Sequence, residues 1–310
     1  MHKRKERDKL SYAYFENDQK GKRVMLQLFT DTSANLPVVL TKKYHITVIP
    51  FSYTVDGKET DYPDDTDFDG AAFYGAMRSG AVVKTSMVSP ALMEEYFERA
   101  LSAGDDVLYV GMSGGISGTA QAAAIAAGEL TERYPERRIV TIDTYAASLG
   151  EGLQVLEAAE MIEEGKSLEE IKEQLLVRRP HMCQFFTVDD LAYLKRGGRI
   201  SGATALIGTV LSIKPILRGD ETGHIVSCGK VRGMKRAYAE LANYYDTRAL
   251  DKSEGIGIAH ADNAEGAQAL LALLRDKGFT GECLNVVYEP VTGAHVGPGT
   301  VALFFYGTEK

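Results

Sequence analysis

Short apolar runs alternate with helix-like segments over the first half of the chain, and this alternation most constrains the fold. The apolar runs are residues 24–29, 46–53, 107–112 and 139–142, and the helix-like segments are residues 68–77, 91–103, 119–134 and 149–164. Strands that alternate with helices join into parallel βαβ units, whose sheet is covered on both faces. We therefore predict a parallel α/β domain over residues 24–180.

The second half has a different pattern of predicted elements, with more strands and fewer helices. Six candidate strands fall at residues 185–188, 213–217, 224–228, 256–259, 284–288 and 301–306, and two long helices at residues 234–248 and 264–277. Residues 220–223, Asp-Glu-Thr-Gly, read as a hairpin turn. This pattern predicts a smaller α/β domain over residues 181–310, with a mixed sheet and helices on one face.

Charge and cysteine content exclude several classes of function. A formal net charge of -8 argues against nucleic acid or an anionic membrane surface as the main partner. Residues 1–23 are charged but have no apolar segment, so we expect a solvated leader rather than a secretory signal. Cys183, Cys228 and Cys283 are widely spaced, which indicates reduced thiols in a cytoplasmic protein and no zinc site.

Three loops rich in serine, threonine and glycine follow predicted strands, at residues 30–37, 84–90 and 112–119. In an open parallel sheet, ligands bind beyond the carboxyl ends of the strands, where helix N-termini present free N–H groups. Helix capping alone accounts for any single loop, as it does for Ser89 before Pro90. Because two such loops at one sheet edge would lie close together, we predict an anion site there.

The loop at residues 112–119 also has a partial dinucleotide fingerprint. Its Ser-Gly-Gly-Ile-Ser-Gly lacks the first glycine of the pattern, and Asp143 ends the next strand. A dinucleotide-dependent oxidoreductase therefore stays open as an alternative. None of the three loops has the lysine of a phosphate-binding loop, so we do not expect this chain to bind ATP itself.

Residues 65–70 begin like a calcium-binding loop, with three aspartates at alternate positions and a glycine. The twelfth position is Ala76, where a bidentate glutamate is required, and no helix precedes the segment. We predict no metal here, and a helix cap at Thr66 or Asp67.

His295 stands just before a Gly-Pro-Gly turn and the last apolar strand. Gly293, Gly297 and Gly299 surround it with backbone that permits close approach, which is typical of a ligand-binding loop. A hydrogen-bonded structural role is the alternative for His295, as it is for His260.

Positive charge gathers in two other stretches, where Arg199 and Arg232 are flanked by glycine. Either arginine is suited to hold an anion or to meet an acidic partner.

Several of these stretches together resemble the DegV family, which includes the fatty-acid-binding subunits of bacterial fatty acid kinases. The motifs occur in the family's order between Val24 and Tyr306: TDTSANLP, TSMVSP, SGGISGTAQAA, DTYAASLG, VDDLAYLKRGGRIS, LSIKPIL and HVGPGTVALFF. The resemblance implies a Rossmann-like α/β domain followed by a smaller α/β domain with a mixed six-stranded sheet. It also implies a fatty acid whose tail lies inside the protein and whose carboxylate lies at the domain junction.

Carried over to this sequence, the carboxylate-binding residues are Thr85, Ser86, Ser117 and His295. Supporting or partner-facing positions are Arg199, Arg232, Asp31 and Ser33. The family usually has Asp-Ser-Thr where this chain has Asp31-Thr32-Ser33, and often Gln-Pro where it has Met87-Val88. These departures leave the preferred acyl chain open.

From this resemblance we expect a cytoplasmic fatty-acid-binding protein, not itself an enzyme and without a cofactor. It would bury a long-chain fatty acid and present the carboxylate to a separate ATP-binding kinase subunit, which forms an acyl phosphate. A lipid or small-molecule carrier without a kinase partner is the second alternative. The prediction requires the four carboxylate-binding side chains to converge at the mouth of an apolar tunnel.

Overall fold

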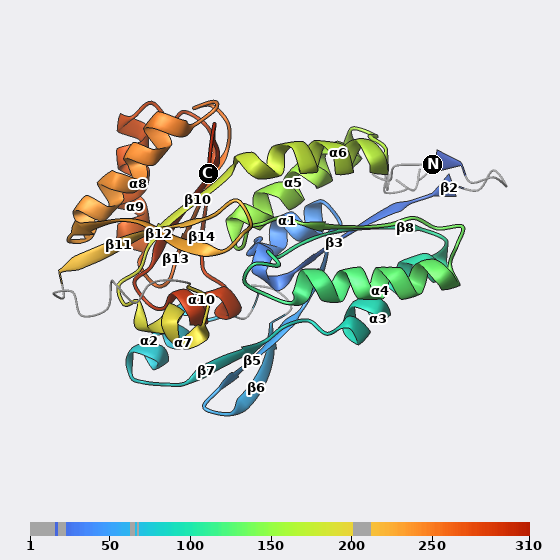
Figure 1. The fold of residues 1–310 in the computed structure, drawn as a ribbon, viewed down its shortest axis with the longest axis horizontal. Helices are drawn as coiled ribbons and strands as arrows, with labels where there is room; N and C mark the ends of the chain where they lie inside the picture. Colours follow the sequence, from blue (N-terminus) through green and yellow to red (C-terminus); the bar gives the residue numbers. More distant parts are fainter. Residues whose placement is uncertain (1–15, 18–22, 63–65, 67, 201–211) are drawn as a thin grey trace, which may run out of the picture.

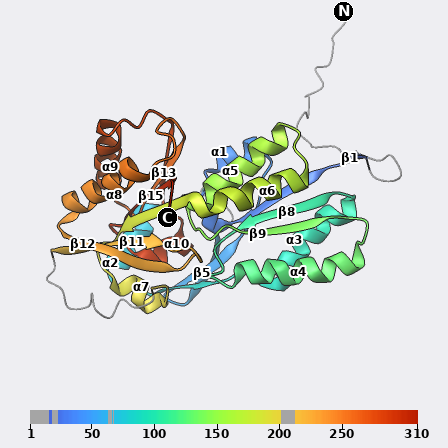
Figure 2. The same ribbon diagram turned by 45° about the horizontal axis from the view of Figure 1, so that its top comes forward.

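A four-stranded parallel sheet organises the first half of the chain. In the computed structural model, which describes residues 16–17, 23–62, 66, 68–200 and 212–310, its strand order is β4-β3-β8-β9. The strands are β3 (Leu26–Asp31), β4 (Thr47–Ile49), β8 (Asp106–Gly111) and β9 (Ile139–Asp143). Helices α3 (Pro90–Ala103) and α4 (Thr119–Arg133) lie on one face, and α1 (Val38–Lys43), α5 (Leu149–Glu163) and α6 (Leu168–Arg178) on the other (Figures 1 and 2). The predicted parallel α/β layer is confirmed.

A small antiparallel sheet projects from this layer and was not predicted. It contains β5 (Phe51–Val55), β6 (Lys58–Tyr62) and β7 (Val83–Ser86), in the order β6-β5-β7 (Figure 1). The predicted strand at residues 46–53 is in fact two strands in different sheets, divided at Pro50, which has no N–H to donate. Thr85 and Ser86 therefore lie in an edge strand, not in a loop after a parallel strand.

Helix α2 (Gly70–Arg78) connects β6 to β7. Its N-cap is Asp69, whose carboxylate accepts a hydrogen bond from the N–H of Ala72 at 2.9 Å. The expected cap at Thr66 or Asp67 is wrong, because the helix begins later than the sequence pattern suggested; Asp67 itself lies outside the described residues. At helix α3 the prediction holds: Ser89 accepts from the N–H of Leu92 at 3.2 Å, and Pro90 occupies the first turn.

The second half forms a mixed six-stranded sheet, as the resemblance implied. Its order is β12-β11-β10-β15-β13-β14, and only the β13–β14 pair is parallel. The strands are β10 (Met182–Thr187), β11 (Ile213–Gly219), β12 (Ile225–Arg232), β13 (Ile256–His260), β14 (Cys283–Val287) and β15 (Val301–Tyr306). Helices α8 (Met234–Arg248) and α9 (Ala264–Asp276) cover the outer face (Figure 1).

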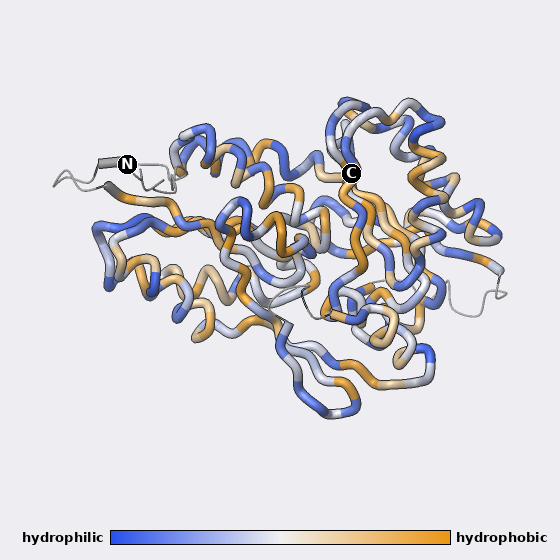
Figure 3. The backbone as a smooth tube through the Cα atoms, turned by 180° about the vertical axis from the view of Figure 1, so that it is seen from behind, coloured by the Kyte–Doolittle hydropathy of each residue, from blue (hydrophilic) through white to orange (hydrophobic). Residues whose placement is uncertain are grey.

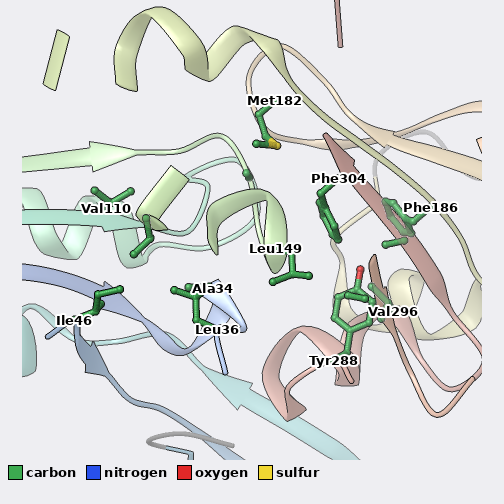
Figure 4. Packing of buried hydrophobic residues seen from close by; sticks show 14 of the residues in the cluster. Ala34, Leu36, Ile46, Val110, Leu149, Met182, Phe186, Tyr288, Val296 and Phe304 are labelled. Carbon is green, nitrogen blue, oxygen red and sulfur yellow. The ribbon is translucent and has the colours of Figure 1, made fainter. Parts of the chain in front are cut away.

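The inner face of this sheet packs on the first half of the chain through α5. One buried cluster joins both halves, and Figure 4 shows Val110 from the parallel sheet and Ile46, which precedes β4, in the same packing as Phe304 from β15. A Cβ at Gly257 would lie 2.7 Å from the Cβ of Leu149, so glycine lets the start of α5 approach β13 closely. Figure 3 shows the same arrangement by hydropathy, with largely apolar strands in the interior and helices in which apolar and polar residues alternate.

Several short elements at the junction of the two halves were not predicted. They are η1 (Thr32–Ala34), η2 (Arg179–His181), α7 (Ala192–Gly197) and α10 (Pro290–Val296). The predicted ligand-binding loop around His295 is wrong, because His295 lies in the last turn of α10. That helix starts where Glu289 caps it and Pro290 takes the first position, and it ends at Gly297 with φ 80°.

The expected solvated leader, residues 1–23, lies largely outside the described residues. The part that the structure describes forms β1 (Glu16–Asn17), which pairs with β2 (Arg23–Val24) in an antiparallel ladder.

Candidate functional site

One small cavity lies where β7, α7, α10 and the loop before α4 meet. Its polar lining includes Thr85, Ser86, Ser117 and His295, the four predicted carboxylate-binding residues, together with Arg199. Its apolar wall is made of Phe51, Met112, Ile116, Leu194, Val291 and Val296, which come from both halves of the chain. The fold thus gathers residues from four distant segments around one space.

The cavity measures about 40 Å³, which is room for one or two water molecules. Pockets that hold a small organic ligand span roughly 300–1,000 Å³. This cavity is therefore too small to be the expected apolar tunnel. A long acyl chain enters only if the apolar side chains around the cavity move apart.

His295 and Thr85 form the central polar contact of the site. The Nε2 of His295 lies 2.8 Å from the Oγ1 of Thr85, across 210 residues of sequence. Burial, and then the positive charge of Arg199, lower the pKa of His295 to about 4. The imidazole is therefore neutral at pH 7. One ordinary hydrogen bond joins it to the threonine hydroxyl, and the tautomer of the ring decides which group donates.

The ring of His295 packs directly on α7. A Cβ at Gly197 would overlap the Nδ1 of His295, so only glycine fits at the end of that helix. The Lys-Arg-Gly-Gly-Arg stretch, residues 195–199, thus has a packing role in addition to its charge. It fixes one side of the imidazole.

Ser117 lies in the loop that opens α4. Its Oγ is 2.9 Å from the Oγ1 of Thr119 and accepts the N–H of Thr119 at 3.3 Å. Gly118 occupies the N-cap position and makes no side-chain cap, so Ser117 supplies the hydroxyl at this helix start. The N-terminus of α4 contributes a partial positive charge on this side of the cavity.

Arg199 joins the two halves of the chain at the site. Its Nε donates to the carbonyl of Ile116 at 3.2 Å, and its Nη1 donates to the carbonyl of Gly197 at 2.5 Å. The first carbonyl precedes α4 and the second ends α7, so the guanidinium ties the two loops together. Arg232, by contrast, is exposed at the end of β12 and does not line this cavity.

Asp31 and Ser33 lie beneath the site and are buried. The carboxylate of Asp31 accepts from the backbone N–H of Ser33 at 2.9 Å, the N–H of Met112 at 3.1 Å and the hydroxyl of Tyr109 at 2.5 Å. Burial raises the pKa of Asp31, and these donors partly offset the rise. Asp31 thus holds the backbone of Met112, which lines the cavity, and neither Asp31 nor Ser33 is exposed to a partner.

Two buried glutamates also support the site, and sequence reasoning missed both. Glu151 on α5 accepts hydrogen bonds from the hydroxyls of Thr30, at 3.1 Å, and Ser33. Burial and the nearby charge of Asp31 raise its pKa well above the usual range. No sequence pattern marks it as buried, because a single glutamate in a helix is normally solvated.

Glu289 caps the helix that carries His295. Its carboxylate accepts the N–H of Val291 and, at 2.6 Å, the N–H of Thr292, and burial raises its pKa to about 7. Its own N–H donates to the Oδ1 of Asn35 at 3.1 Å, so the cap is linked to the loop after β3. The Glu289-Pro290 pair was the available sequence signal for a helix start.

Two other candidates from the sequence have structural roles. Asp143 accepts the N–H of Gly114 at 3.0 Å and of Tyr145 at 2.9 Å, so its carboxylate holds the loop that has the partial dinucleotide fingerprint. His260 accepts the N–H of Asn263 at 3.2 Å through Nδ1, at the start of α9. Neither side chain reaches the small cavity.

Within the described residues, no group of three or more His, Cys, Asp or Glu side chains is arranged to hold a metal ion. Cys183, Cys228 and Cys283 are free. None of the helices in the described part of the chain has the length and apolar character needed to cross a membrane.

Comparison with known proteins finds relatives over nearly the whole chain. A family model described as "Uncharacterised protein, DegV family" matches residues 25–308. A DegV domain-containing protein of Clostridium perfringens is 38% identical over 286 residues, which make up 91% of this chain and 98% of that protein.

Solved structures agree with the sequence comparison. One from Thermus thermophilus, described as "Fatty Acid Binding of a DegV family Protein", has a TM-score of 0.81 and 32% identity, covering 91% of this chain and 99% of its own. The crystal structure of a DegV lipid binding protein from Thermotoga maritima has a TM-score of 0.81 and 28% identity, covering 92% of this chain and 99% of its own.

Proposed function

This chain belongs to the DegV family, and we propose that it binds a long-chain fatty acid and presents the carboxylate to a separate ATP-dependent kinase subunit. The observation that carries the proposal is the cavity in which Thr85, Ser117 and His295 meet an apolar wall. Two related solved structures, described as lipid binding and as fatty acid binding, support a fatty acid as the class of ligand. The proposal places the protein in the cytoplasm, where ATP is available to the partner.

The tail and the carboxylate of the proposed ligand contribute differently to the free energy of binding. Burying one methylene is worth about 0.8 kcal/mol, so roughly fourteen of them supply on the order of 11 kcal/mol before the cost of association. Removing a carboxylate from water costs several kcal/mol, and each hydrogen bond to it returns about 1.5–3 kcal/mol. The tail therefore gives affinity, while the polar residues fix the position of the carboxylate.

Each polar residue has a defined task in holding the head group. Neutral His295 offers one ring N–H, Thr85 and Ser117 offer hydroxyls, and Arg199 supplies a positive charge at a fixed place. A carboxylate beside His295 favours the protonated ring, so binding raises the pKa of His295 from its low value. The head group is thus held by groups that the fold has already positioned.

The reaction itself belongs to the partner subunit and needs no catalytic group here. A carboxylate oxygen of the fatty acid forms a bond to the γ-phosphorus of ATP. The bond from that phosphorus to the β–γ bridging oxygen breaks, and its electron pair leaves with ADP. No proton is taken up or released, so this chain acts by orientation alone.

Native mass spectrometry tests the ligand directly. Protein purified from bacterial cells, or stripped and then given palmitate or oleate, is expected to carry one fatty acid per chain. A Ser117→Ala variant is expected to retain the tail but to be phosphorylated more slowly by the kinase subunit, because the carboxylate is less well held. Protein that is reproducibly empty and takes up neither fatty acid would rule out the proposal.

A carrier without a kinase partner is the second candidate, and Arg232, which is exposed and does not line the cavity, can discriminate the two. Under the kinase proposal, Arg232→Glu keeps fatty acid bound but loses phosphorylation. Under the carrier alternative, no kinase subunit phosphorylates the fatty acid bound to the wild-type protein.

A dinucleotide-dependent oxidoreductase is the third candidate, and a fluorescence titration with NADH or NADPH is expected to show no binding.

A further inference from the structure

A second cavity adjoins the fatty-acid site and has a different character. It measures about 260 Å³, and Thr85, Arg199 and His295 line both cavities. Beyond these three residues it is bordered by β7 and by Tyr193, Arg196 and Gly197 of α7. We call this space the Arg196 cavity. A carboxylate held by Thr85 and His295 therefore has the apolar wall on one side and the Arg196 cavity on the other.

The Arg196 cavity has positive charge and no carboxylate in its lining. Its charged lining residues are Lys84, Arg196 and Arg199. Arg196 is exposed and stacks over the ring of Tyr193, 5.0 Å from the centroid, and among the described residues it has no ion-pair partner. Arg199 also contributes to lowering the pKa of His295, which reflects the positive field at this boundary.

A third cavity nearby is less suited to an anion, because its lining includes a carboxylate. It measures about 640 Å³ and borders the same site through Ser117 and Arg199. The carboxylate of Asp143 also lines it, so an incoming anion meets a negative charge there. Of the two larger cavities beside the head group, the Arg196 cavity is thus the one whose lining favours an anion.

We propose that the Arg196 cavity binds the phosphoryl group of an acyl phosphate while the acyl chain occupies the apolar cavity. This proposal rests on the proposed function, because it takes the fatty-acid head group to lie between Thr85 and His295. In that position the next group along the molecule extends into the adjoining space. Arg196 and Arg199 supply the planar guanidinium donors that suit a phosphoryl group.

The test uses a stable mimic of palmitoyl phosphate, 2-oxoheptadecylphosphonate, in which a methylene replaces the bridging oxygen. Titration calorimetry would compare this phosphonate with palmitate on the wild type and on Arg196→Gln. We expect the substitution to weaken phosphonate binding about tenfold or more, as the loss of a charge-assisted hydrogen bond does. Palmitate binding should change by no more than about twofold.

Lys195→Gln is the matched control, because Lys195 precedes Arg196 on α7, is exposed and does not line the cavity. It should leave both affinities within about twofold of wild type, which separates a local contact from a general effect of charge. If Arg196→Gln weakens both ligands equally, or neither, the phosphoryl assignment is overturned while fatty-acid binding stands. If wild-type protein binds no palmitate, the proposed function itself fails.

Discussion

At the scale of single residues, the site depends on a histidine that the protein keeps uncharged. His295 is partly buried against Thr85 and Gly197 and lies near the fixed charge of Arg199. Protonating the ring in the empty protein would place a second cation beside the arginine. The ring is therefore neutral in the empty protein, and under the proposed function a bound carboxylate would favour its protonated form.

The lowered pKa of His295 should make the empty protein less stable at low pH. His295 has a pKa of about 4 in the folded state against an ordinary value of 6.5, so the unfolded chain binds a proton first as pH falls. The free energy of unfolding should therefore drop between pH 6.5 and 4, by on the order of 3 kcal/mol from this residue. Urea unfolding of wild type and His295→Gln at pH 7 and pH 4.5 measures the difference, and equal losses in the two proteins would contradict the assignment.

The close approach of Gly197 to His295 predicts a sharp effect of one methyl group. Gly197→Ala should push the imidazole away from Thr85, cost about 1–3 kcal/mol of stability and weaken fatty-acid binding. Gly128→Ala in α4 is the control, because a Cβ there meets nothing within 4 Å. It should stabilise the helix by about 0.5–1 kcal/mol. Chemical denaturation and palmitate titration would test both, and an undisturbed Gly197→Ala protein would refute the packing argument.

At the scale of elements, α10 is the part of the site that depends most on its neighbours. It has seven residues, which is too short to be stable alone, and it is held by the buried cap at Glu289. Asn35 links this cap to the loop after β3, and Asp31 holds the N–H of Met112 in the cavity wall. Buried carboxyl groups thus position backbone on both sides of the site.

The cap at Glu289 predicts a pH dependence of opposite sign to that of His295. Because its pKa is raised to about 7 in the folded protein from an ordinary 4.5, the folded state holds the proton more tightly. The stability that this group contributes should fall as pH rises from 4.5 through 7, by on the order of 3 kcal/mol. Glu289→Gln should remove that dependence, which unfolding curves at pH 5 and pH 8 would reveal. An unchanged pH profile in the variant would show that Glu289 titrates normally.

At the scale of the whole molecule, two sheets share one core through α5, and the proposed fatty-acid site lies where the two halves meet. The cavity of about 40 Å³ means that an acyl tail must displace apolar side chains contributed by both halves. Ligand uptake is then coupled to the packing between the sheets. A protein built this way should be stabilised as one unit by its ligand.

Hydrogen exchange with and without palmitate tests that coupling. Palmitate at about one hundred times its dissociation constant should raise the free energy of unfolding by about 2.7 kcal/mol. Slower exchange is expected in β7 and the start of α4, and equally in α7 and α10, because the site takes residues from all four. Protection confined to one half of the chain would contradict a site shared between them.

Most of the regular layers were predictable from sequence, because strand and helix periodicity is a local property of the chain. The parallel strands β3, β8 and β9, the two outer helices of the second half and the cap at Ser89 follow from patterns of a few residues. The motif set also identified the family. The domain boundary near residue 180 stays a prediction, as do the assigned roles of Thr85, Ser86, Ser117 and His295.

The layers and the family could thus be recognised from local patterns, since both depend on residues close together along the chain. Tertiary structure alone decided that β7 is a strand, that His295 sits on a short helix, and that it meets Thr85 across 210 residues. It also decided that Glu151 and Glu289 are buried, which raises their pKa values, and that the cavity at the site is small. The physical reason is that burial, desolvation and contact between distant segments arise only when the sheets pack together.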